Sequence, residues 1–152
     1  MRRKKLPSRK SLIRKLDKIS SEIARGATIR VFGNCPFCRS APIQGAFHWI
    51  TRSKHSVRWE IENLIASCYG CNCTMEFNPH PFIQFFLDRW GRYSYDALIR
   101  KSNKIAHFSR SDLIEKLENM TANKMSLLND LVVLLGYTPK TNRIDPGEGD
   151  KP

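Results

Sequence analysis

Apolar residues recur with helical spacing near both ends of the chain, and this pattern predicts most of its helices. Between Ser11 and Arg25 the spacing places five aliphatic side chains on one face, at positions 12, 13, 16, 19 and 23. Gly26 suits the end of that helix. Residues 81–90 carry a second apolar face, which Gly91 ends, and residues 95–104 predict a further short helix.

The C-terminal third predicts two more helices. Ser109 or Ser111 can cap the first of them, and its periodicity breaks near residues 121–123. The second helix follows this break and stops at Gly136. The apolar positions of the two faces are Leu113, Ile114, Leu117, Met120, Met125, Leu128, Leu131, Val132 and Leu135. Residues 138–152 mix proline, glycine and charges, which predicts a disordered tail.

The centre of the chain has a different pattern, made of short extended runs. Residues 28–32 are rich in β-branched side chains and predict a strand, residues 42–50 predict an extended segment, and residues 63–67 predict a second strand. A helix is expected from about Cys71, and it should end before Pro79 because the residue before a proline disfavours the helical conformation. These elements predict the fold class α+β.

Charge is concentrated at one end of the chain. The 152 residues carry a formal net charge of +12. Residues 1–30 hold eleven Lys and Arg against two acids, residues 31–80 four against three, and residues 81–152 eleven against nine. A strongly basic arm beside a nearly neutral core is typical of nucleic-acid binders. The alternatives are a solvated tail that aids solubility and a membrane-surface helix, which the lack of large aromatic residues in the arm disfavours.

The sequence argues against a membrane-spanning or exported protein. Its longest apolar run, residues 131–135, is too short to cross a membrane. Residues 1–5 are basic, like the start of a signal peptide, but no continuous apolar segment follows them. Four of the five cysteines have metal-type spacing, which fits a reduced cytoplasm better than a disulfide framework.

Two Cys-x-x-Cys pairs are the strongest chemical signal in the chain. Cys35 and Cys38 form the first pair and Cys68 and Cys71 the second, and together they can supply four thiolates to one tetrahedral Zn²⁺. Four thiolates close the coordination sphere, so this zinc would be structural. The remaining cysteine, Cys73, is interpreted as a small buried apolar residue; it could replace Cys71 as a ligand, but its spacing is poorer.

The residues between and after these pairs resemble the HNH, or ββα-metal, nucleases. In that fold a histidine of the first strand activates water, and a middle asparagine or histidine orients it. A histidine or asparagine after the last zinc cysteine helps to hold a divalent metal on the scissile phosphate. His48, Asn63 and Asn72 fall on these three places. Without this context, a lone histidine is more often a packed or surface residue than a base.

A narrower resemblance is to the NinG/Rap family of phage recombination endonucleases. It rests on GAFHWITRS from Gly45, RWEIEN from Arg58, CYGCN from Cys68 and MEFN from Met75. The family shows a GHxISR-like segment, an RWDExN-like segment, and CxxCN followed by a GN-like pair. These motifs are specific in combination and weak individually, and the resemblance covers about residues 33–100.

Two positions depart from the pattern of these nucleases. Phe47 stands where many HNH enzymes carry an acidic metal ligand, and Phe77 stands where the family tends to have glycine. The first departure leaves the metal site with few ligands.

The resemblance implies a structure-selective DNA endonuclease of branched recombination intermediates, such as Holliday junctions and D-loops. It would act in the cytoplasm of the bacterial host of a phage. It implies Mg²⁺ or Mn²⁺ as a catalytic cofactor besides the structural zinc. The candidate ligands of that second metal are Asn72, Asn78 and His80, and Glu76 is a further contributor. Asparagine suits a hard cation through its carbonyl oxygen.

A set of cations is expected to contact DNA phosphates. Its members are Arg2, Arg3, Lys4, Lys5, Arg14, Lys15, Lys18, Arg52, Lys54 and Arg58. The alternative for each is a solvated surface charge. Of the remaining histidines, His55 is interpreted as a surface residue and His107 as a structural one. The three tryptophans are predicted to lie in the core, because each is near other apolar residues.

The predicted organisation has four parts. Residues 1–26 are a basic arm and helix, residues 27–104 a zinc-bound HNH-like core, residues 105–137 a C-terminal helical part and residues 138–152 a tail. Two alternatives to a branched-DNA endonuclease stay open: a site-specific or nicking HNH endonuclease, and a non-catalytic zinc-finger DNA-binding protein. A homodimer through the apolar faces of the C-terminal helices is a further hypothesis, weighed equally against those faces covering the core or each other.

Overall fold

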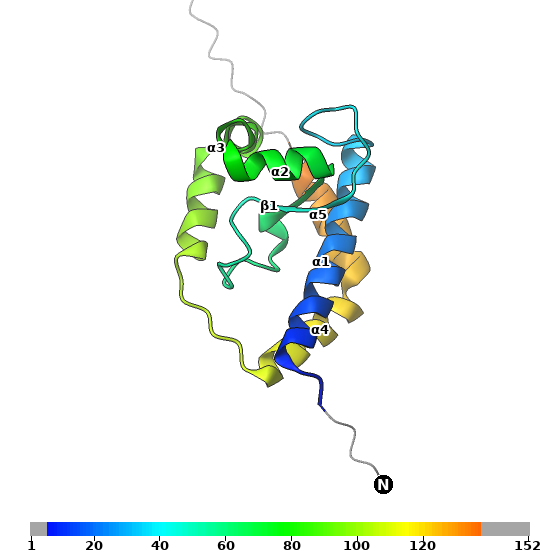
Figure 1. Ribbon diagram of the computed structural model, residues 1–152, viewed down its shortest axis with the longest axis vertical. Coiled ribbons are helices and arrows are strands. Elements are labelled where there is room, and N and C mark those ends of the chain that lie inside the picture. Colours follow the sequence, from blue (N-terminus) through cyan, green and yellow to red (C-terminus); the bar gives the residue numbers. More distant parts are fainter. Residues whose placement is uncertain (1–5, 138–152) are drawn as a thin grey trace, which may run out of the picture.

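The computed structural model describes residues 6–137, which form a mostly helical α+β fold around a two-stranded hairpin (Figure 1). The elements follow in the order α1 (Arg9–Phe32), β1 (Gly45–His48), a 3₁₀ turn η1 (Ile61–Asn63), β2 (Leu64–Ser67), α2 (Tyr69–Phe77), α3 (His80–Ser102), α4 (Arg110–Ala122) and α5 (Lys124–Gly136). The predicted α+β class is confirmed. The basic arm at residues 1–5 and the tail at residues 138–152 lie outside the described residues.

The first helix is longer than its apolar pattern predicts. Ser8 caps it by accepting a hydrogen bond from the backbone N–H of Ser11 at 3.2 Å. It ends only at Gly33, whose φ of 76° is a left-handed conformation that glycine adopts without a steric penalty. The strand predicted for residues 28–32 is therefore wrong, because these residues are the last turns of α1. The boundary placed between residues 26 and 27 falls inside one continuous helix.

Two residues explain why the helix continues. Gly26 does not end it; Leu128 of α5 lies against its bare backbone, so the small residue serves helix packing. Thr28 donates its hydroxyl hydrogen to the carbonyl of Ala24 at 2.7 Å and accepts from the backbone N–H of Ala66, in β2, at 2.9 Å. A β-branched residue that looked like part of a strand thus joins α1 to the hairpin.

The hairpin matches the two extended segments predicted at residues 42–50 and 63–67. Its strands are antiparallel, with Phe47 opposite Ile65 and His48 opposite Leu64. All four residues of β2 are buried, because α1 packs against this strand. Since side chains alternate along a strand, Phe47 points into the core and the half-buried His48 points to the other face.

The remaining helices follow the predicted pattern closely. α2 begins at Tyr69, slightly before the expected start at about Cys71, and it ends before Pro79 as expected. α3 is divided at Gly91, whose φ of 81° and ψ of 164° are not helical, so its two halves correspond to the two predicted helices. Ser109, and not Ser111, caps α4: its hydroxyl accepts from Asp112 N at 3.1 Å, and the Asp112 carboxylate accepts from Ser109 N at 2.6 Å.

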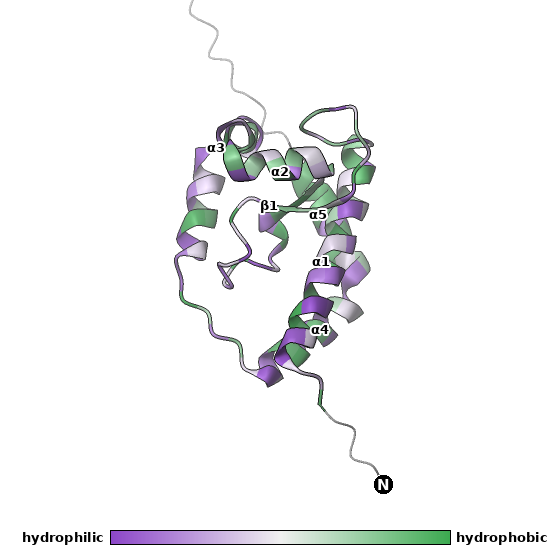
Figure 2. Ribbon diagram, viewed as in Figure 1, coloured by the Kyte–Doolittle hydropathy of each residue, from purple (hydrophilic) through white to green (hydrophobic). Residues whose placement is uncertain are grey.

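The core forms around aromatic side chains that link the hairpin to the loop before it and to α3. Trp49, Trp59 and Trp90 are all buried, which confirms the prediction that they are core residues. Figure 2 shows that α1 carries hydrophilic residues beside hydrophobic ones along its length. Ring centroids between 4.8 and 5.6 Å apart connect Phe37, Phe47, Trp49, Phe82, Phe86 and Trp90.

The apolar faces of α4 and α5 are used inside the chain. Both helices pack against α1, and their most apolar positions are buried there. The buried residues are Leu113, Met120, Leu128, Leu131 and Leu135. α1 therefore covers most of the positions that were named for a homodimer interface, and the homodimer itself stays a prediction. Within residues 6–137, no helix has the length and apolar character needed to cross a membrane.

Candidate functional site

The four predicted zinc ligands come together in space. The Sγ atoms of Cys35, Cys38, Cys68 and Cys71 all lie within 4.8 Å of one another, and those of Cys38 and Cys68 are 3.9 Å apart. A tetrahedral zinc with bonds of about 2.3 Å to sulfur separates its ligands by about 3.8 Å. The cluster therefore has the donor set and the spacing of a structural zinc site.

Local backbone structure builds the two halves of this cluster. In the first half, Cys35 N donates to Ala41 O, and Arg39, with a φ of 62°, donates from its N–H to Cys35 O. In the second half, Cys68 is the N-cap of α2, and its Sγ accepts from the backbone N–H of Cys71 at 3.4 Å.

The electrostatics of the thiols point to a cation. Hydrogen bonds from the backbone of Ser40 and Ala41 and from the Ser40 side chain lower the pKa of Cys38 to about 6. Burial and the neighbouring thiols raise the pKa of Cys71. Four thiolates this close repel one another, and a divalent ion is what allows all of them to be ionised.

His48 has a fixed tautomer and a neutral ring. Its Nε2 lies 3.2 Å from the backbone carbonyl oxygen of Arg58, and because a carbonyl can only accept, Nε2 carries the hydrogen. Burial lowers the pKa of His48 to about 4, and the nearby positive charge of Arg52 acts in the same direction. Near neutral pH the ring is therefore uncharged, with a lone pair on Nδ1.

Asn63 is fully buried, and its side chain holds the loop between the strands. Its Oδ1 accepts from Ile50 N at 2.7 Å, and its Nδ2 donates to the carbonyls of Ile50 and Val57 at 3.0 and 3.1 Å. The role predicted for Asn63 was to orient a catalytic group. In the structure these hydrogen bonds fix the backbone at Ile50 and Val57, between His48 and Arg58, and the predicted catalytic role stays a prediction.

Arg58 is committed to an internal ion pair. Its Nε and Nη2 donate to the two carboxylate oxygens of Asp17 at 2.9 and 2.7 Å, and its Nη1 donates to Arg52 O at 3.2 Å. The Arg58 side chain is 16% exposed. Asp17 occupies the fork of the Arg58 guanidinium, so a contact between Arg58 and a DNA phosphate stays a prediction that competes with this ion pair.

The predicted ligands of a second metal lie on the surface of the molecule. Asn72, Asn78, His80 and Glu76 are all exposed on α2 and at the turn after it. Among residues 6–137, the cysteine cluster is the only group of three or more Cys, His, Asp or Glu side chains close enough to share an ion. Phe47, which the resemblance aligned with an acidic ligand of HNH enzymes, is 1% exposed and packs in the aromatic core.

Exposed cations surround the loop and the outer face of α1. The predicted contacts at Arg14, Lys15, Lys18, Arg52 and Lys54 are all exposed. Both acids of α1 are paired with cations of other elements, since Asp17 binds Arg58 and Glu22 binds Lys124. The outward positive charge of α1 is therefore not cancelled by its own acids.

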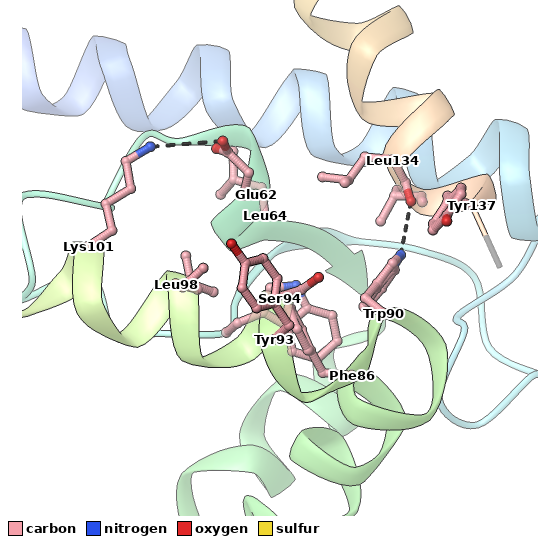
Figure 3. Close-up of a pocket in the computed structure, with 13 residues that line it drawn as sticks. Glu62, Leu64, Phe86, Trp90, Tyr93, Ser94, Leu98, Lys101, Leu134 and Tyr137 are labelled. Carbon is pink, nitrogen blue, oxygen red and sulfur yellow. Dashed lines mark hydrogen bonds and ion pairs between the residues drawn. The ribbon is translucent and has the colours of Figure 1, made fainter. Parts of the chain in front are cut away.

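A separate pocket of about 390 Å³ lies between α3, the segment η1–β2 and the end of α5 (Figure 3). Its wall is mainly apolar, and Trp90 Nε1 donates to Leu134 O at 2.9 Å there. Lys101 Nζ lies 3.9 Å from the Glu62 carboxylate at its edge. Its described lining contains no cysteine or histidine, so the thiol and imidazole chemistry of the chain lies elsewhere.

Asp17 was not among the predicted site residues, and the burial predicted for Cys73 was wrong. Asp17 also accepts from Trp59 Nε1 at 2.9 Å, so it holds two neighbouring residues of the loop. The signal available in the sequence was an acid inside a strongly basic helix. Trp59 was predicted only as a core residue. Cys73 is partly exposed on α2, so the prediction that it is buried is wrong.

Comparison of the chain with protein-family models, with curated proteins and with solved structures gives no match.

Proposed function

We propose that the chain is an HNH-type endonuclease that hydrolyses phosphodiester bonds in DNA. Branched recombination intermediates, such as Holliday junctions and D-loops, are the proposed substrates. The four-cysteine cluster would hold a structural Zn²⁺ that joins the loop after α1 to the start of α2. Because this cluster fixes the end of β2, zinc would organise the hairpin that carries His48.

The observation that carries the proposal is the state of His48. It lies on the first strand of a hairpin whose second strand leads through Cys68 into a helix, in the order β1, β2, α2. Its ring is neutral, and the Arg58 carbonyl holds Nε2 at 3.2 Å. A neutral imidazole with one nitrogen fixed and a lone pair on the other is suited to act as a general base.

The proposed chemistry follows from that lone pair. Nδ1 of His48 takes a proton from a water molecule as the water oxygen forms a bond to phosphorus. The bond between phosphorus and the leaving oxygen breaks, and that oxygen takes a proton from solvent. Arg52 and Lys54, exposed on the same loop, hold the flanking phosphates, and the exposed cations of α1 hold the duplex.

A divalent ion would neutralise charge on the scissile phosphate and the leaving oxygen. Asn72, Asn78 and His80 offer oxygen and nitrogen donors, and all three side chains are exposed. No step is therefore routed through an ion held by these side chains. Whether cleavage depends on added Mg²⁺ or Mn²⁺ is part of the test.

A second candidate function is a non-catalytic zinc protein that binds DNA. The burial of Phe47 favours it, because the position where HNH enzymes carry an acid is here part of the core. The low pKa of His48, about 4, also makes it a weaker base than one near neutrality. In this second function the cysteine cluster and the basic surface have the same roles, but His48 does not cleave DNA.

Cleavage of linear, flapped and four-way DNA with Mg²⁺, with Mn²⁺ and with a chelator of these ions tests the proposal. Binding to the same DNAs is measured separately without added metal. Metal-dependent cleavage that prefers the branched DNAs supports the proposed substrate. Equal cleavage of linear duplex favours the site-specific or nicking endonuclease, and binding without cleavage under every condition favours the zinc protein.

A further inference from the structure

The carboxylate of Asp17 is the point where α1 holds the loop that follows β1. Both of its oxygens are used: Oδ1 accepts from Arg58 Nε and Trp59 Nε1, each at 2.9 Å, and Oδ2 accepts from Arg58 Nη2 at 2.7 Å. A guanidinium bound through two parallel hydrogen bonds is fixed in orientation as well as in distance. Hydrogen bonds from Arg58 and Trp59 outweigh burial and lower the pKa of Asp17, so this carboxylate stays charged.

The same arginine contacts the candidate base through its backbone. The carbonyl of Arg58 accepts the Nε2 hydrogen of His48, while the side chain of Arg58 is held by Asp17. The Arg58 Nη1 also donates to Arg52 O, which closes the loop on itself. The position of the carbonyl that meets His48 therefore depends on a side-chain anchor in another element.

The loop has anchors on both sides of this carbonyl: Ser56 Oγ donates to Ser102 O at 3.2 Å, and Glu60 pairs with Lys101 and Lys116. Its backbone hydrogen bonds are turns, such as Lys54 N to Thr51 O and Arg58 N to His55 O, the second at 3.4 Å. Asn63 holds the carbonyl of Val57, one residue earlier. Asn63 therefore fixes the loop from the hairpin side, and Asp17 fixes it from α1.

We infer that Asp17 is a positioning residue for His48: by anchoring Arg58, it places the carbonyl that selects the Nε2–H tautomer and leaves Nδ1 as the base. This inference rests on the proposed function for its consequence in catalysis. The tautomer of His48 can be measured without any reference to cleavage, so the two claims fail separately.

The test compares Asp17→Asn with Glu22→Gln. The first substitution keeps the size of the side chain but replaces an acceptor of Arg58 with a donor. The second removes an equal charge from the same helix, where Glu22 pairs with Lys124 of α5 and not with the loop. Nitrogen-15 chemical shifts of the His48 ring report the tautomer, and turnover on branched DNA reports catalysis.

In the native protein and in Glu22→Gln we expect one protonated and one unprotonated ring nitrogen, assigned to Nε2 and Nδ1. In Asp17→Asn the two shifts should move toward each other, and kcat should fall by about tenfold or more with little change in KM, since a misplaced catalytic group costs up to about a hundredfold. Asp17→Glu should keep the two nitrogen shifts partly separated and should recover part of the lost kcat.

A fixed Nε2–H tautomer and native kcat in a folded Asp17→Asn protein would overturn the inference. If Asp17→Asn does not fold, Arg58→Lys replaces it, because lysine keeps the charge but cannot form the two parallel hydrogen bonds. The two nitrogen shifts should again move toward each other. A fixed Nε2–H tautomer with native kcat in Arg58→Lys would likewise overturn the inference. Loss of the tautomer in a protein that never cleaves DNA would support the positioning role and contradict the proposed function.

Discussion

Leu128 of α5 occupies the space that a side chain at Gly26 of α1 would need: a β-carbon built on Gly26 would lie 2.7 Å from Leu128 Cδ1. Gly26→Leu should therefore lower the free energy of unfolding by about 2 kcal/mol through overpacking. Gly26→Ala should cost less, because alanine gains up to about 1 kcal/mol of helix propensity over glycine. Chemical denaturation of the two variants measures this.

Gly26→Leu combined with Leu128→Ala provides the control. The smaller side chain at position 128 should recover part of the stability lost in the single variant, because the two residues share one space. A Gly26→Leu protein as stable as the native one would show that α1 and α5 are not in close contact at this point.

Zinc removal should unfold the centre of the molecule. Metal analysis is expected to find one zinc per chain, and Cys35→Ser or Cys68→Ser should lose both the metal and the cooperative unfolding transition. Cys73→Ser is the matched control, because Cys73 lies outside the cluster formed by the other four cysteines. Folded native protein without bound zinc would contradict this account of the cluster.

His48 should make stability depend on pH in a defined window. Its pKa is about 4 in the folded protein and near 6.5 in an unfolded chain, so between these values the unfolded state binds the additional proton. The free energy of unfolding should therefore fall as pH decreases from about 6.5 toward 4. Asp17 and Glu60, whose pKa values are lowered from 3.8 and 4.5, lose their contributions only at lower pH.

The measurement is denaturant unfolding between about pH 5 and 6.5, where the carboxylates add little. The slope of unfolding free energy against pH measures how many more protons the unfolded state binds than the folded state. In His48→Gln, which cannot titrate, this number should fall by up to about one. An identical slope in the two proteins would mean that the His48 ring is not held neutral by the fold.

The cations of α1 should set the salt dependence of DNA binding. Replacing Arg14, Lys15 and Lys18 by glutamine should reduce the slope of log affinity against log salt by about 0.9 for each phosphate that the variant no longer neutralises. Arg92→Gln is the control, because Arg92 is an exposed cation of α3 that pairs with Asp96. Equal slopes in the native and triple variants would place the DNA elsewhere.

Much of the fold could be predicted from the sequence, because local signals decided it. The Cys-x-x-Cys pairs predicted the cluster, Ser109 marked the start of α4, and Gly91 marked a break. The strand predicted for residues 28–32 was wrong because β-branched residues also fit a helix when tertiary contacts favour it. The contact that decides this segment joins Thr28 to Ala66, which is far away in the sequence.

The candidate site was predictable only in part, for a similar reason. The histidine and the cysteines could be identified by their type and spacing. The pairing of Arg58 with Asp17 could not, since the two residues are in different elements, and an arginine in a basic loop has the same appearance whether it is free or paired. The buried faces of α4 and α5 were also ambiguous, because an apolar stripe does not reveal which helix covers it.

The most direct test of the central claim is cleavage of four-way DNA by the native protein and by His48→Ala under single-turnover conditions, with binding measured on the same samples. The substitution removes the base but no positive charge at neutral pH, because the ring is neutral there. We expect His48→Ala to bind this DNA with native affinity and to lose cleavage. Cleavage by His48→Ala at the native rate would contradict this expectation.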